Sequence, residues 1–164
     1  MRRRLAVLAL AALVSACAAP QLTGIATGLA PRMAAPARPL AEPATATFAF
    51  APFPGIPGNI SDDLLVRIWQ RAEREGLNVV KRPGGRALFT VEGTLTAVSD
   101  DNNAVLFYVF DVHDVAGRRL HRISGRKRSN ASDGDPWASV QDADLDVIAR
   151  RLAALLRAWL YADA

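Results

Sequence analysis

The chain contains a single cysteine, Cys17, among its 164 residues, so no disulfide can form within it. Only two histidines are present, and with no further thiol a structural zinc site is not expected. The sequence also lacks internal repeats, a nucleophile elbow, a zincin motif and a dinucleotide-binding fingerprint. We therefore expect no metal and no other cofactor. The fold has to be stabilised by its hydrophobic core alone.

Residues 1–16 have the parts of a secretory signal peptide. Three arginines follow the first methionine, and an apolar run spans residues 5–14, which is too short for a bilayer-spanning helix of about 20 residues. Small residues precede Cys17, and this pattern resembles the lipobox of bacterial lipoproteins. The resemblance implies cleavage before Cys17 and acylation of that residue, with palmitate as a typical chain. An ordinary signal peptide with an incidental cysteine is the alternative.

Two further expectations concern location and partners. In lipoproteins an aspartate after the cysteine retains the protein in the inner membrane, and here that position is Ala18. The resemblance therefore implies an outer-membrane anchor on the periplasmic side. Removal of the signal's three arginines leaves 17 basic and 16 acidic side chains. Because this mature charge is almost balanced, we expect no nucleic-acid partner.

The chain divides by composition into three parts. Residues 1–16 are the expected signal, and residues 17–44 are rich in alanine and proline with few charges. We interpret 17–44 as the lipidated cysteine followed by a disordered tether. Residues 45–164 contain the periodic apolar patterns and are expected to form one globular domain.

Apolar periodicity and turn residues predict an α+β two-layer sandwich, a mostly antiparallel sheet with two amphipathic helices on one face. Ser61 is expected to cap the first helix and Gly76 to end it. Asp135 is expected to cap the second helix, whose apolar stripe includes Leu155. The predicted order is β-α-β-β-β-β-α, with strands at 45–53, 77–81, 88–98, 104–113 and 120–129.

Turn lengths predict which residues of the last three strands face each other. A turn at 100–103 pairs residues whose numbers sum to 203, so Thr96 meets Phe107. A three-residue loop at 115–117 would pair residues that sum to 232, so Asp111 would meet His121. The face away from the helices would then carry two features, the row Glu92, Asp111 and His121 and an apolar patch of Val105, Phe107, Val109 and Ile123.

These features lead to three hypotheses. The apolar patch, which no predicted element covers, indicates a binding surface for an envelope protein or another envelope component, and the protein is then not an enzyme. The loop after the first strand or the tether could equally cover it. Alternatively, Asp111 and His121 could serve an envelope hydrolase as acid and base, although a solvated charge ladder explains them better. Third, Arg122 and Arg126 could bind the glycan of peptidoglycan in a structural lipoprotein.

Several segments resemble those of small, uncharacterised lipoproteins of alphaproteobacteria. They are residues 57–62 (PGNISD), 110–119 (FDVHDVAGRR), 121–125 (HRISG) and 135–138 (DPWA). The resemblance implies a cell-envelope location and brings no established activity. The leading interpretation is a lipid-anchored accessory lipoprotein that binds a partner.

Overall fold

The computed structural model describes residues 41–82, 85–100, 103–129 and 134–162. Cys17, the expected signal and nearly all of the expected tether lie outside these residues. The elements of the described chain follow the order expected from the sequence. They are β1 (Thr47–Phe50), α1 (Gly58–Arg74), β2 (Asn78–Val79), β3 (Phe89–Asp100), β4 (Asn103–His113), β5 (Arg119–Ser129) and α2 (Asp142–Leu160).

The strands form one open sheet in the order β2-β1-β3-β4-β5. The short strand β1 pairs in parallel with both β2 and β3. The long strands β3, β4 and β5 are joined by antiparallel pairing. Strand β5 therefore forms one edge of the sheet, and β2 forms the other.

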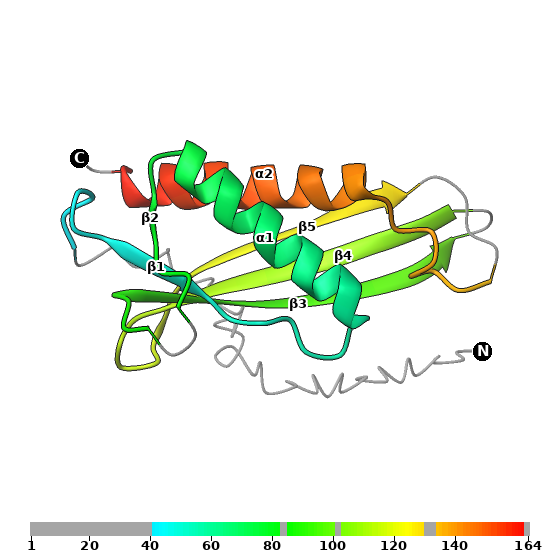
Figure 1. The fold of residues 1–164 in the computed structure, drawn as a ribbon, viewed down its shortest axis with the longest axis horizontal. Helices are drawn as coiled ribbons and strands as arrows, with labels where there is room; N and C mark the ends of the chain where they lie inside the picture. Colours follow the sequence, from blue (N-terminus) through cyan, green and yellow to red (C-terminus); the bar gives the residue numbers. More distant parts are fainter. Residues whose placement is uncertain (1–40, 83–84, 101–102, 130–133, 163–164) are drawn as a thin grey trace, which may run out of the picture. The chain divides into compact units, whose positions relative to one another are not determined.

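Both helices lie over the same face of the sheet (Figure 1). Alternate residues of the strands, such as Val91 and Phe110, point into the core, where they join Ile68 of α1 and Leu152 of α2. None of these four side chains is more than 1% exposed. The predicted α+β two-layer sandwich is confirmed. No helix among the described residues combines the length and apolar character needed to cross a membrane.

The first helix begins earlier than the sequence pattern predicted. The backbone N–H groups of Ile60 and Ser61 both donate to the carbonyl of Pro57 at 3.0 Å, so the first turn starts at Gly58. Ser61 is consequently inside the helix and buried, and its prediction as the N-cap is wrong. The apolar side chain of Ile60 explains the difference, because its burial in the core brings the preceding turn into the helix.

The second helix begins later than predicted. Asp135 caps a separate turn, in which its side chain accepts a hydrogen bond from the N–H of Trp137 at 3.0 Å. Helix α2 starts only at Asp142, and the N–H of Gln141 donates to the Asp144 carboxylate at 3.1 Å. Leu155, expected in the apolar stripe, is 38% exposed because the buried stripe passes on either side of it.

Candidate functional site

The face of the sheet opposite the helices carries the candidate site, and we call it the outer face. Between β3 and β4 the pairing follows the predicted register, since Thr96 faces Phe107 and Thr94 faces Val109. The odd-numbered residues of β4 therefore point outward, as the alternation of side chains along a strand requires. Phe107 is 45% exposed there, and no element of the described chain covers it.

Between β4 and β5 the predicted register holds only beside the turn. His113 pairs with Arg119, but the register shifts after that pair, and Val112 faces His121. Leu120 is the extra residue of this β-bulge. Every later residue of β5 is thereby turned to the face opposite to the one expected. Ile123, predicted in the outer apolar patch, pairs with Phe110 and is buried in the core with 3% exposure.

The bulge also places arginines on the outer face, next to the apolar residues of β4. Arg126 lies directly across from Phe107, and Arg128 lies across from Val105. Together they border a hollow of about 400 Å³. We call the residues that line it the outer patch, which consists of Val98, Ser99, Val105, Phe107, Arg126 and Arg128.

The arginines of the outer face differ in their partners. Arg122 donates two hydrogen bonds to the Asp111 carboxylate, at 2.7 and 2.6 Å. The hydrogen bonds from Arg122 hold the pKa of Asp111 below its usual value, so this carboxylate stays ionised. Arg126 is exposed and forms no ion pair with any residue in the described part of the chain. Its guanidinium is therefore available to an anionic partner.

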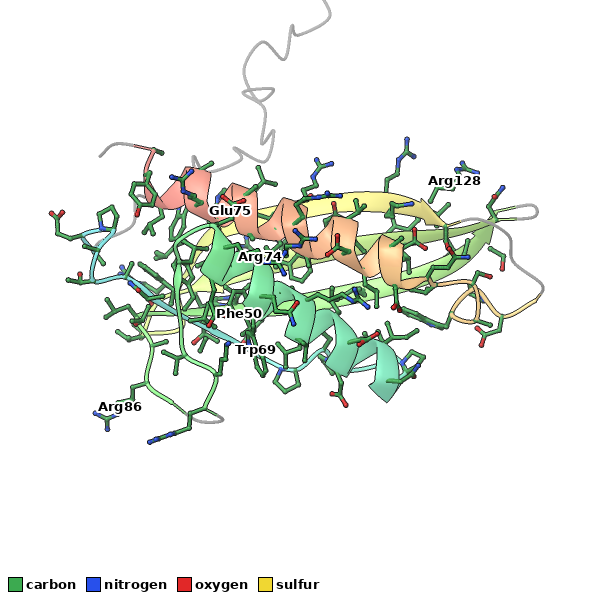
Figure 2. The ribbon with its side chains drawn as sticks, turned by 45° about the horizontal axis from the view of Figure 1, so that its top comes forward. Phe50, Trp69, Arg74, Glu75, Arg86 and Arg128 are labelled. Atoms are coloured by element: carbon green, nitrogen blue, oxygen red, sulfur yellow. The ribbon has the colours of Figure 1, made fainter. Side chains whose placement is uncertain are left out.

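A second hollow, of about 690 Å³, includes Arg86, Glu92 and His113 in its lining. Figure 2 shows Arg86 and Arg128 at opposite ends of the sheet, so this hollow lies away from the outer patch. Nδ1 of His113 is 3.8 Å from Oε2 of Glu92, and the Glu92 side chain is 64% exposed. A solvated carboxylate at this distance is not a pre-organised acid–base pair. Within the described ranges, no group of three or more acidic, histidine or cysteine side chains could hold a metal ion.

The row proposed for a hydrolase is not formed. Asp111 points outward and bonds to Arg122, whereas His121 points to the helices and stacks on Trp159. The two rings are 5.5 Å apart and nearly parallel, at 3°. Burial lowers the pKa of His121, so the imidazole is neutral in the folded protein at pH 7. Because the two side chains lie on opposite faces of the sheet, they cannot act together as acid and base.

The sequence reasoning missed three members of the outer patch, namely Val98, Ser99 and Arg128. Val98 has the same parity as Thr94 and Thr96, so the alternation along its strand was a sufficient signal. Arg128 could not be placed, because the bulge at Leu120 reverses the parity of β5 and has no separate sequence signal. Of the proposed binding residues, the structure brings Val105, Phe107 and Arg126 together and leaves Val109 and Arg122 beside them.

No protein-family model and no curated protein sequence matches the chain. Solved structures are similar to it. The PelC dodecamer from Paraburkholderia phytofirmans is 14% identical, with 76% of this chain and 92% of that chain covered and a TM-score of 0.50. XCC0632 from Xanthomonas campestris, described as DUF330, is 9% identical over 78% and 95% of the chains, with a TM-score of 0.46.

Lipoprotein GNA1162 from Neisseria meningitidis is 12% identical, with 73% of this chain and 98% of that chain covered and a TM-score of 0.41. None of these three descriptions names an enzymatic activity. At these identities a likeness reports the fold and nothing finer. The chain therefore shares its fold with the subunit of the PelC dodecamer.

Proposed function

We propose that this chain is a lipid-anchored, periplasm-facing accessory lipoprotein of the cell envelope, which binds an envelope component and catalyses no reaction. Residues 1–16 would be its signal and 17–44 its lipidated tether, with the globular domain beginning near residue 45. The outer patch carries the proposal. Exposed valine and phenylalanine side chains lie there beside Arg126, which forms no ion pair with the described residues. Aromatic residues and arginine are enriched in protein-binding surfaces.

The anchor is tested by replacing the sulfur of Cys17. In Cys17→Ser the thioether to diacylglycerol cannot form, so we expect no incorporation of labelled palmitate and release of the protein from the membrane fraction. Ser15→Ala is the matched control, because it leaves the acceptor sulfur in place. A serine variant that still fractionates with the outer membrane would contradict the anchor.

The binding face is tested by crosslinking in cells. A photoreactive amino acid at position 107 should give a discrete adduct, whereas the same group at Ala154, which is exposed on α2, should give none. Replacing Val109 by glutamate should reduce the adduct at 107, because a charge at the border of the patch disfavours apolar contact. Equal labelling at both positions, with intact folding, would count against this face.

Binding to peptidoglycan, the alternative function, can be distinguished from binding to a protein by sedimentation with purified sacculi. Arg122 is already bound to Asp111, so only Arg126 remains to meet a glycan carboxylate. If the protein sediments with purified sacculi and Arg126→Gln abolishes this, the partner is the cell wall. Loss of the crosslinked adduct without any effect on sedimentation identifies a protein partner instead.

A further inference from the structure

The charge of the outer patch favours some binding partners over others. Among the described residues that line it, the outer patch contains Arg126 and no carboxylate, and Arg126 forms no ion pair with any residue that the structure describes. Two outer patches facing each other would bring Arg126 of one copy close to Arg126 of the other, and this meeting of like charges is unfavourable. The chain's own tether is also a poor cover, since residues 18–44 carry Arg32, Arg38 and only one acid, Glu42. An acidic surface with some exposed apolar area fits better.

Such a surface is present on the helical layer of the same chain. Asp62, Asp63 and Val66 are exposed on the first half of α1, and Val66 is 43% exposed. Residues at these spacings share one side of a helix. Asp142 at the start of α2 lies beside them, since Arg67 contacts both Asp63, at 3.6 Å, and Asp142, at 3.0 Å.

The four α1 and α2 residues Asp62, Asp63, Val66 and Asp142 are called the acidic patch. Arg67 offsets one of its three carboxylates, so the patch has a net negative charge. Asp62 has no ion pair with the residues that the structure describes. The acidic patch is thus complementary to the outer patch, because its charge is opposite to that of Arg126 and its exposed Val66 can pack against the exposed Val98 and Phe107.

We propose that the outer patch of one copy of this chain packs against the acidic patch of a second copy, front to back. This inference rests on the proposed function in that it uses the same binding face. Because each copy presents both surfaces and uses a different one toward each neighbour, the contact is heterologous. Such contacts build closed rings when the rotation closes.

The test is the molar mass of the full-length lipoprotein in detergent, measured by light scattering over a range of concentrations. We expect an assembly of more than two copies. Arg126→Glu or Asp63→Arg should raise the concentration for half-assembly about tenfold or more, because like charges then meet at the contact. Arg86→Glu, at the other end of the sheet, is the matched control and should assemble normally.

Recovery of assembly in a double charge reversal distinguishes a direct contact between the two patches from misfolding of the single variants. The variant carrying both Arg126→Glu and Asp63→Arg should assemble again, and so should an equimolar mixture of the two single variants, since complementary surfaces then alternate. A monomer at every concentration, or an assembly that is indifferent to both charge reversals, would overturn the inference. If position 107 still crosslinks to another protein in that case, the proposed function stands without it.

Discussion

At the scale of single residues, one buried charged cluster connects the edge strand to the second helix. Nζ of Lys127 is 2.7 Å from Oδ1 of Asp144, and the hydroxyl of Ser129 donates to Oδ2 at 2.6 Å. Burial disfavours the charge of Asp144, but the hydrogen bonds from Lys127, Ser129 and the Gln141 backbone outweigh it, and the pKa is lowered. Asp144 therefore stabilises the contact between β5 and α2 as a carboxylate.

Asp144→Asn should lower the free energy of unfolding by about 2 kcal/mol, since hydrogen bonds to a charged group are lost in a buried site. Urea unfolding measures this. Glu73→Gln, which breaks the exposed ion pair with Lys81, is the control and should cost less than about 1 kcal/mol. Because the folded-state pKa of Asp144 is lowered, its stabilisation is complete above its ordinary value of 3.8 and is lost as the pH falls through the folded-state value. Equal losses in the two variants would contradict this role.

His121 predicts a second pH dependence. Burial lowers its pKa below the ordinary value of 6.5, so the unfolded chain takes up the proton first as the pH falls. The free energy of unfolding should therefore decrease from about pH 7 to pH 5 in the native chain. His121→Phe keeps an aromatic ring against Trp159 and removes the titration, so its stability should vary less over this interval. The same pH slope in both proteins would show that His121 is not responsible.

At the scale of elements, β3 is kept close to its neighbours by a glycine. A Cβ atom added at Gly93 would lie 2.5 Å from Cε1 of Phe53 and 2.8 Å from Cδ1 of Phe110. Those two rings pack edge to face, with centroids 5.9 Å apart. The missing side chain therefore provides the space in which the aromatic pair packs on the sheet.

Gly93→Ala should destabilise the fold by about 1–3 kcal/mol, because two buried rings have to move. Thermal unfolding followed by circular dichroism checks this. The control is Gly58→Ala at the start of α1, where no atom lies within 4 Å of the added methyl group and no loss is expected. A Gly93 variant as stable as this control would show that the rings can move aside easily.

The elements themselves could be predicted because each depends on local pattern. The alternation in β3 and the turn that pairs Thr96 with Phe107 are set within a single hairpin, and both predictions were confirmed. The helix starts were misassigned, because α1 already begins with hydrogen bonds to the Pro57 carbonyl and Asp135 caps a separate turn before α2.

The site was less predictable, because it depends on a single extra residue. The turn after β4 was predicted with the correct length, yet Leu120 bulges and reverses the faces of everything after it in β5. That reversal turned His121 and Ile123 to the side of the helices, where Ile123 is buried, and turned arginines to the outer face. The position of a bulge depends on packing in the sheet and not on the turn residues alone. Here Leu120 is buried in the core.

At the scale of the whole molecule, the two faces of the sheet differ in what they contact, since the inner face packs on the helices and the outer face carries the exposed outer patch. The inner face of the sheet and the two helices enclose the hydrophobic core, which includes the fully buried Phe48 and Leu156. This core stabilises the fold, since a single cysteine allows no disulfide within the chain. On the outer face, the exposed Phe107 lies opposite Arg126, which has no ion pair within the part of the chain that the structure describes. Exposed apolar side chains that gather in one patch, here Val98 and Phe107, are typical of an interaction surface. We therefore propose that the outer patch is covered by a partner in the cell.

The most direct measurement is labelling of a thiol in cells. Cys17 is the one cysteine of the chain, and once acylated it cannot react, so Phe107→Cys introduces a single reporter. A maleimide that reaches the periplasm should label Ala154→Cys strongly and Phe107→Cys several-fold more weakly, while both react fully in the purified, dissociated protein. Equal labelling of the two positions in cells would contradict the account.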